Sequence, residues 1–261
     1  MAGPALPRQA NPALPRQGNR VVLGVDGCRA GWVVASLAVP VGASDGDGGG
    51  SGGGGDAPPA AEVVGDFDVV ADRLARGEVA HVAVDMPIGL PDAGSRPCDL
   101  EARRLLGPRR SSVFPAPARA TLGAASYADA LERSRAATGR GLSVQAYNLL
   151  ASIAEVERAA RRLGQARLTE THPELAFAAL AGSPLAWPKR HPAGAAARRR
   201  ALVAVLPGVA DPPDQRLTGA RPDDVADACV LAWSARRLWC GQATRLGGER
   251  DGTGLRMEIA W

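Results

Sequence analysis

Four short apolar runs, with one helix between the third and the fourth, most constrain how this chain can fold. The runs at 21–26 and 32–39 are joined by the tight-turn sequence GCRAG, and a third run follows at 61–67. Residues 68–76 have helical spacing of their apolar side chains, and 79–84 is a continuous apolar run typical of a buried strand. This order predicts three strands, a helix and an inner strand.

The rest of the chain is predicted to be mostly helical, which makes the fold class α/β. A proline-rich stretch at 87–117 holds one helix candidate, and two further strands are expected at 167–171 and 255–260. Asp223 and its neighbours open the last helix behind Pro222, as acidic first-turn residues do. The predicted helices are 99–106, 127–137, 143–163, 173–180, 195–206 and 223–239.

Aspartates end two of the predicted strands. Asp26 closes the first run and is followed by Gly27, so its carboxylate should lie at the C-terminal edge of the strand, beside backbone that a ligand can approach. Asp85 repeats the arrangement at the end of HVAVD, before the helix-breaking sequence MPIGLP. Each aspartate alone is also explained as a turn cap, but two in equivalent places favour a site.

A third acidic group lies on the last predicted helix. Asp224 and Asp227 are three residues apart and share a helix face, where like charges repel and need a compensating cation. The helix macrodipole explains Asp223 and Asp224, which begin the helix, but not Asp227 on its packing side. The pair therefore indicates a cation at this helix.

The sequence TETHPEL adds two glutamates. Glu170 ends an expected strand, and Glu174 lies in the first turn of the next helix, where it is equally explained as a complement to the helix dipole. Carboxylates at several strand ends, together with an acidic helix, are the oxygen donors that Mg²⁺ or Mn²⁺ requires. We therefore expect a site for a hard divalent cation.

Composition excludes other classes of site and of protein. With 261 residues, of which 46% are hydrophobic, the chain can bury the core of one large domain or at most two small ones. The four cysteines lack C-x-x-C spacing and the histidines number only three, so neither a zinc cluster nor a disulfide framework is expected. No apolar stretch is long enough to span a membrane and no secretory signal is evident, which predicts a cytoplasmic protein.

Two segments are predicted to lie outside the packed core of a single domain over 20–261. Residues 1–19 contain PALPRQ twice and are expected to form a disordered proline-rich arm, and 42–59 are expected to form a flexible Gly-rich loop. The net charge of +4 gives only weak support for an anionic partner. Lys189 is the single lysine among 31 basic residues, a skew that we attribute to genome composition.

Six motifs together resemble one known family. They are GVDGCRAGW at 24–32, VDMPIGLP at 84–91, DLEARRLLGPRRSSVFPAP at 99–117, TGRGLSVQAYN at 138–148, ETHPEL at 170–175 and DDVADA at 223–228. The chain is similar, nearly end to end, to the domain of unknown function 429 family, which consists of predicted nucleases of the ribonuclease H-like fold. The resemblance implies a mixed five-stranded sheet of order 3-2-1-4-5, flanked by helices and carrying an inserted helical segment.

The resemblance also implies a hydrolase mechanism. In related enzymes such as Holliday-junction resolvases, acids on the first and fourth strands and on the last core helix bind two metal ions. Asp26, Asp85 and the pair Asp224 and Asp227 match those positions. Two ions would activate a water molecule and stabilise the leaving oxygen of a phosphodiester displacement. Nucleic acid of unspecified type is the implied partner, a membrane is not, and a homodimer is left open.

These inferences give three sets of candidate site residues. The candidate catalytic residues are Asp26, Asp85, Glu170, Asp224 and Asp227. The candidate ligands of Mg²⁺ or Mn²⁺ are Asp26, Asp85, Glu174, Asp224 and Asp227. The candidate substrate-binding residues lie in proline-bounded or glycine-flanked loops suited to phosphate contact, and are Arg29, Arg109, Arg110, Ser111, Ser112 and Arg140.

Two other functions fit the same residues. GVDGCRAG could form the phosphate loop of a nucleotide-binding phosphotransferase or ATPase-like protein, although such proteins normally carry a second domain with another glycine-rich loop. A non-catalytic module for a ligand or partner could use the same fold. Magnesium-dependent ATP binding would favour the first, and inactivity on junction, duplex, hybrid and single-stranded substrates would favour the second.

Overall fold

Five strands form one mixed sheet in the order β3-β2-β1-β4-β5. The computed structural model describes residues 20–39, 59–206 and 217–261, so the predicted arm at 1–19 and nearly all of the predicted loop at 42–59 lie outside the described residues. The first three strands are antiparallel neighbours, and the last two run parallel to β1. This arrangement confirms the predicted ribonuclease H-like fold class. The strands are β1 (Arg20–Cys28), β2 (Gly31–Val39), β3 (Ala60–Val64), β4 (His81–Val84) and β5 (Leu168–Glu170).

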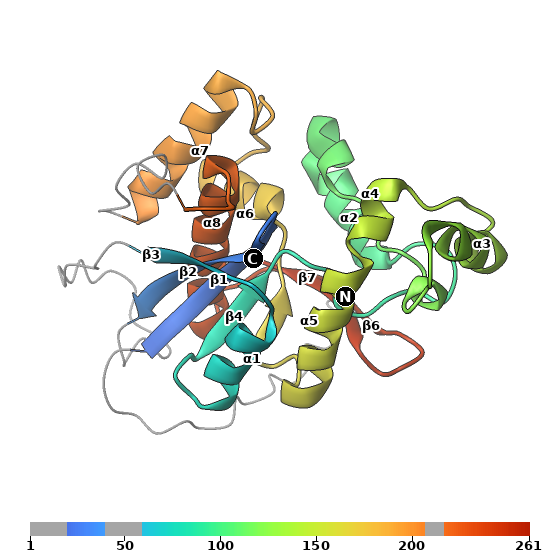
Figure 1. Ribbon diagram of the computed structural model, residues 1–261. Coiled ribbons are helices and arrows are strands. Elements are labelled where there is room, and N and C mark those ends of the chain that lie inside the picture. Colours follow the sequence, from blue (N-terminus) through green and yellow to red (C-terminus); the bar gives the residue numbers. More distant parts are fainter. Residues whose placement is uncertain (1–19, 40–58, 207–216) are drawn as a thin grey trace, which may run out of the picture.

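Helices cover both faces of the sheet (Figure 1). One face packs against α1 (Asp68–Ala75) and α5 (Leu150–Leu163), and the other against α6 (Pro173–Ala181), α7 (Pro192–Val205) and α8 (Pro222–Trp239). Because side chains alternate along a strand, successive residues of β1 enter the two cores in turn. The sheet is therefore buried on both sides, as the continuous apolar runs predicted.

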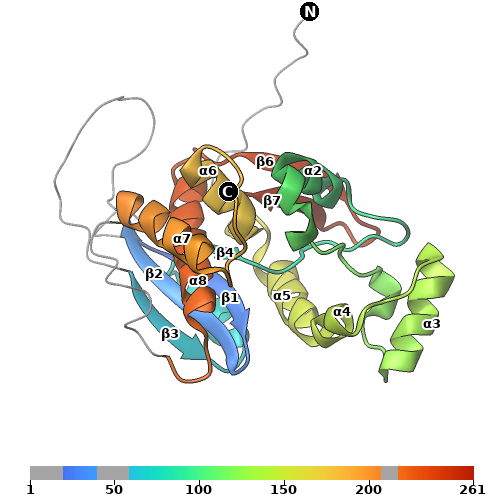
Figure 2. The same cartoon turned by 90° about the horizontal axis from the view of Figure 1, so that it is seen from above.

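An inserted helical segment lies beside this sandwich, with α3 and α4 projecting from it (Figure 2). The segment contains α2 (Pro97–Leu106), α3 (Tyr127–Thr138) and α4 (Val144–Asn148), together with the 3₁₀ turns η1 (Gly107–Ser112) and η2 (Arg119–Thr121). No helix in the described parts of the chain is both long and apolar enough to cross a membrane.

Two elements differ from the sequence prediction. The helix expected over 143–163 is divided between α4 and α5 at Leu149, whose N–H bonds to the Ala146 carbonyl three residues earlier at 3.2 Å and so tightens the turn. β6 (Arg245–Arg250) pairs with β7 (Arg256–Ala260) in a hairpin. β7 corresponds to the strand predicted at 255–260, but β6 was not predicted, because its sequence has no alternation of apolar and polar residues. Gly247 and Gly248 of β6, at φ +73° and +122°, form a β-bulge that interrupts the alternation of side chains along this strand.

Helix α8 lies directly against the backbone of β1 at Gly24. A methyl group built on Gly24 would lie 2.0 Å from the Ala232 nitrogen and 2.1 Å from the Ala228 oxygen. Only a residue without a side chain permits this approach, because the clashing atoms belong to the helix backbone and cannot rotate away. This contact fixes the distance between the first strand and the last core helix.

We expect Gly24→Ala to destabilise the protein by about 1–3 kcal/mol or more, since overpacking here must displace a helix from the sheet. Urea denaturation followed by circular dichroism would measure the change. Gly65→Ala is the matched control, because a methyl group there meets no atom within 4 Å. Equal midpoints for the two variants would contradict the expectation.

A candidate active site at the sheet edge

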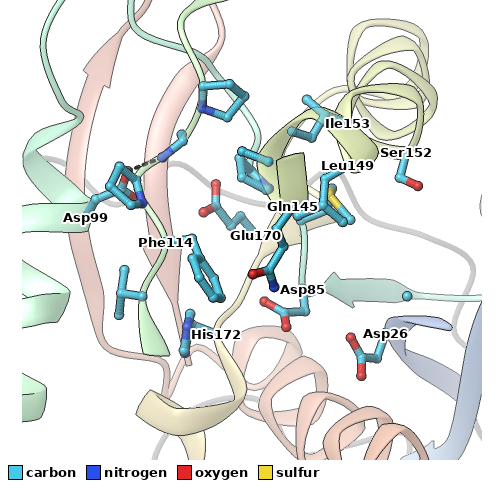
Figure 3. Close-up of a pocket in the computed structure, with 18 of the residues that line it drawn as sticks. Asp26, Asp85, Asp99, Phe114, Gln145, Leu149, Ser152, Ile153, Glu170 and His172 are labelled. Atoms are coloured by element: carbon cyan, nitrogen blue, oxygen red, sulfur yellow. Dashed lines mark hydrogen bonds between the residues drawn. The ribbon is translucent and has the colours of Figure 1, made fainter. Parts of the chain in front are cut away.

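Asp26 and Asp85 lie side by side near the C-terminal ends of β1 and β4. Val25 and Val84 are Cα partners in this parallel pair, and the Asp85 N–H donates to the Val25 carbonyl at 3.0 Å. Because side chains alternate, Asp26 lies on the same face as Gly24, which is the face that α8 covers. Figure 3 shows both carboxylates next to each other at the cavity. The structure thus brings together the two strand-end aspartates that the sequence singled out.

Helix α8 adds a third carboxylate. Asp227 precedes Ala228, the residue that touches Gly24, and its side chain is 5% exposed. Asp227 is close enough to Asp26 and Asp85 for their charges to interact. The site therefore combines two strands and a helix that are far apart in the sequence.

The pKa values of all three carboxyl groups are raised, with burial as the main cause. For Asp26 the pKa lies well above its ordinary value because of burial, then of the charges of Asp85 and Asp227. Burial likewise raises the pKa of Asp85, and it raises the pKa of Asp227 to about 6 although Lys189 opposes the shift. Clustered carboxylates of this kind favour a bound cation, which would stabilise their charged forms.

Asp224 lies one turn earlier on α8 and has a structural partner. Its carboxylate accepts a hydrogen bond from the Arg221 N–H at 2.9 Å, which caps the start of the helix. By contrast, the carboxylates of Asp26 and Asp85 accept no hydrogen bond and form no ion pair within the described ranges. Asp26 and Asp85 are therefore the two acids of the cluster whose oxygens are available to a ligand.

The acidic residues at the start of α8 were expected to need a compensating cation. The side chain of Lys189 provides one. Lys189, on the segment between α6 and α7, places its Nζ 2.5 Å from Asp227 Oδ2 and 3.5 Å from Asp223 Oδ2. The sequence argument looked for a metal ion beside Asp224 and Asp227. The Lys189 ammonium is one such cation for Asp227, and ligation of a metal by Asp224 and Asp227 stays a prediction.

A cavity of about 340 Å³ opens over Asp26 and Asp85. One wall is the loop 113–117 and the other is formed by residues 145–153 at the start of α5. Phe114 is 54% exposed and lines the first wall, while the Gln145 side chain points from the second wall toward Asp85 (Figure 3). An aromatic ring and a free amide thus border the two carboxylates.

Glu170 also lines the cavity, but Arg96 holds it. Arg96 Nη1 and Nη2 donate to the two Glu170 oxygens at 2.7 and 2.6 Å, and the Ile88 N–H donates to Glu170 at 2.7 Å. The same guanidinium pairs with Asp99, also buried, at 2.5 Å. Arg96 thus joins β5, α2 and the loop after β4. We call these ion pairs of Arg96 with Glu170 and Asp99 the Arg96 clamp. Glu170 is part of this clamp, and its catalytic role stays a prediction.

Glu174 is likewise engaged. Its carboxylate accepts from Arg198, which is buried, and from Arg109 Nη2 at 3.4 Å. It does not line the cavity. The Arg198–Glu174 ion pair joins α6 to α7. Glu174 therefore has a structural role in addition to complementing the dipole of α6. Its role as a metal ligand stays a prediction.

None of the six residues predicted to contact phosphate lines the cavity. Arg29 and Arg140 are exposed in turns outside it. Arg109 faces Glu174, and the Ser112 hydroxyl donates to the Arg109 carbonyl at 2.7 Å, which closes η1. The six are Arg29, Arg109, Arg110, Ser111, Ser112 and Arg140. The structure thus separates these loop residues from the acidic floor.

Three residues near the acids were not among the predicted site residues, although His172 and Gln145 lie inside two of the six family motifs. His172 accepts from the Glu174 N–H through Nδ1, so its Nε2 carries the proton and donates to the Ser112 carbonyl at 3.2 Å. The single lysine, Lys189, was attributed to genome composition, and Gln145 lies in the motif at 138–148 without having been assigned a role. Only the fold brings them to the aspartates.

The donor set fits a hard divalent cation through two residues. In the described ranges no three His, Cys, Asp or Glu side chains are grouped as ligands of one ion. Mg²⁺, however, is often held by one or two carboxylates, with water and substrate phosphate completing its shell. Asp26 and Asp85 meet that requirement because their oxygens have no other partner.

The fold and the paired edge carboxylates define a ribonuclease H-like α/β protein. Residues 24–251 match the family model described as Protein of unknown function (DUF429), so the chain belongs to this family, as the six motifs indicated. No curated protein matches the sequence.

Two solved structures are similar to this chain. One is RuvC of Thermus thermophilus, at 16% identity and a TM-score of 0.36. The other is the same organism's RuvC in complex with a Holliday junction substrate, at 14% identity and a TM-score of 0.37. Each similarity covers 85% of this chain and 97% of the RuvC chain.

We expect Arg96→Met to destabilise the protein by about 3–5 kcal/mol, because it leaves Asp99 and Glu170 buried without their cation. Chemical denaturation would measure the loss. Arg162→Met removes an exposed ion pair with Asp72 and should cost less than about 1 kcal/mol. A small effect of Arg96→Met would show that the clamp does not hold the loop after β4.

Asp26→Asn should raise the melting temperature of the metal-free protein at neutral pH. The pKa of Asp26 is raised in the folded state, so its ionised form costs stability that Asn does not. The advantage should be absent below pH ~4, where folded and unfolded carboxyls are both protonated, and should grow as the pH rises. About 1 kcal/mol corresponds to ~2–4 °C in a domain of this size.

Thermal melts in a chelator across pH 4–8 would test this expectation. Glu132→Gln serves as the control, because Glu132 is exposed and has no ion pair in the described structure. A lower melting temperature for Asp26→Asn at pH 7 would mean that Asp26 is a buried structural acceptor.

Proposed function

We propose that this protein is a metal-dependent nuclease that hydrolyses phosphodiester bonds. The observation that carries the proposal is the pair Asp26 and Asp85, whose free carboxylates lie together at an open cavity on the edge of a ribonuclease H-like sheet. The pKa is raised at both groups, chiefly by burial, and the nearby charge of Lys189 offsets this shift only in part. A site of this kind favours a divalent cation and, through it, an anionic substrate.

Asp26 and Asp85 are the proposed ligands of Mg²⁺ or Mn²⁺, with Asp227 as the third carboxylate facing them. Metal bound there would polarise the phosphoryl group and lower the pKa of an attacking water, in the two-ion form that the family resemblance implies. The chain itself supplies a rigid frame, since both aspartates are fixed by the β1–β4 ladder.

The walls of the cavity suit a nucleotide. Gln145 points toward Asp85 and has no partner in the described structure, so its amide can bind a phosphate oxygen or a water molecule (Figure 3). Phe114 presents an exposed ring on which a base or sugar can pack. Arg96, the only arginine among the described residues of the lining, is bound to Asp99 and Glu170, so its guanidinium is not available to a phosphate.

We expect purified protein to cleave nucleic acid in Mg²⁺ or Mn²⁺ and Asp85→Asn to lower the rate at least ~100-fold, because it removes one of two free carboxylates. Junction, duplex, hybrid and single-stranded substrates would be assayed in parallel. Glu249→Gln, an exposed acid on β6, is the control and should keep full activity.

The same assay separates the alternatives. Tight, magnesium-dependent ATP binding without cleavage would favour a phosphotransferase or ATPase-like protein. Inactivity on every nucleic acid, together with retained structure, would favour a ligand- or partner-binding module.

A further inference from the structure

The single lysine of this chain, Lys189, contacts the acidic helix α8 beside the candidate active site. The protein uses arginine at every other basic position, including the buried Arg96 and Arg198. Lys189 alone is a lysine, and it is the residue that contacts the acidic face of α8. The composition that favours arginine elsewhere therefore does not explain this position, and a local chemical reason is needed.

The geometry around Lys189 is that of a bound cation. Asp223 and Asp227 are four residues apart on one face of α8, and the Lys189 ammonium bridges their carboxylates at 3.5 and 2.5 Å. Asp26 also interacts with its charge, since Lys189 lowers the Asp26 pKa against the opposing effect of burial. The Lys189 side chain is 36% exposed, so it is only partly covered where it meets the carboxylates.

The backbone that carries Lys189 is fixed rather than free. The His191 N–H donates to the Pro188 carbonyl at 2.9 Å, and Arg198 donates to the Trp187 carbonyl at 3.2 Å. Gly194 on α7 packs so closely that a methyl group there would lie 2.1 Å from the Pro188 oxygen. Helix α7 therefore holds the segment in place and presents Lys189 to α8.

An ammonium suits this place better than a guanidinium. It is a compact point charge with three donors, whereas a guanidinium is planar and wide. Between closely spaced carboxylates an ammonium, like a metal ion, is a compact centre of positive charge, although it carries one charge rather than two. A guanidinium can also bridge two carboxylates, as Arg96 does with Asp99 and Glu170, but it does so through spread-out donors rather than one compact charge.

We infer that the Lys189 ammonium takes the place of the second cation, so that the protein binds one divalent ion, at Asp26 and Asp85. This inference rests on the proposed nuclease function. Asp227 and Asp223 then serve the ammonium rather than a metal. In the hydrolysis, water forms a new P–O bond, the P–O bond to the leaving oxygen breaks, and that oxygen gains the proton that water loses. Lys189 keeps its protons and offsets the charge of the phosphoryl group.

The count of bound ions tests the inference. Titration of the full-length protein with Mn²⁺, followed calorimetrically and by the electron paramagnetic resonance of free Mn²⁺, should give one ion per chain. Lys189→Met should give two, because Asp223 and Asp227 become free, and should lower nuclease activity about 100-fold. Arg190→Met, which changes the exposed neighbour, should bind one ion and keep full activity.

A second variant keeps the test decisive if Lys189→Met does not fold. Asp227→Asn retains an oxygen that can accept from Lys189, so it should still bind one Mn²⁺ with an affinity within a few fold of the parent. Asp85→Asn, in contrast, should lose the ion.

The outcomes separate the two proposals. Two ions in the parent, one ion in folded Lys189→Met, or loss of the ion in Asp227→Asn would each overturn the role of Lys189 and leave the nuclease proposal standing. A parent that binds no Mn²⁺ and cleaves no substrate would overturn the proposed function itself.

Discussion

The close contact between Gly24 and helix α8 is the constraint on which the rest of the structure depends. With no side chain between them, the helix backbone touches the strand at Ala228 and Ala232. That contact places Asp227 beside Asp26, and the parallel pairing of β1 with β4 then places Asp85 beside both. A site made of three short carboxylates tolerates little change in these distances, so the position of one glycine sets the geometry of the whole edge.

The acids around the cavity divide into two groups by their partners. Asp99, Glu170 and Glu174 each face a buried arginine, and these ion pairs join the inserted helical segment to β5 and α7 to α6. Among the residues that the structure describes, no arginine pairs with Asp26 or Asp85. Since an unpaired buried carboxylate costs stability, a fold that neutralises its other acids and leaves these two keeps them for another use. This contrast distinguishes the acids that build the frame from those free to bind a ligand.

The sequence predicted the sheet order and the convergence of Asp26, Asp85 and Asp227, because strand ends and helix faces follow from local patterns and the family resemblance supplied the topology. It could not predict the partners of Glu170 and Glu174. Arg96 lies 74 residues from Glu170, and in a chain with so many arginines no pattern marks the one that pairs. Strand β6 was missed because its paired glycines interrupt any alternation.

The contact at Gly24 also joins residues from opposite ends of the chain, since Ala232 follows Gly24 by more than two hundred positions. During synthesis β1, β2 and β4 leave the ribosome long before α8 exists, and their face remains uncovered until the last helix arrives. An incomplete chain therefore has two aspartates on an open sheet but no assembled site. The three aspartates at this edge can therefore come together only after translation has reached α8, which carries Asp227.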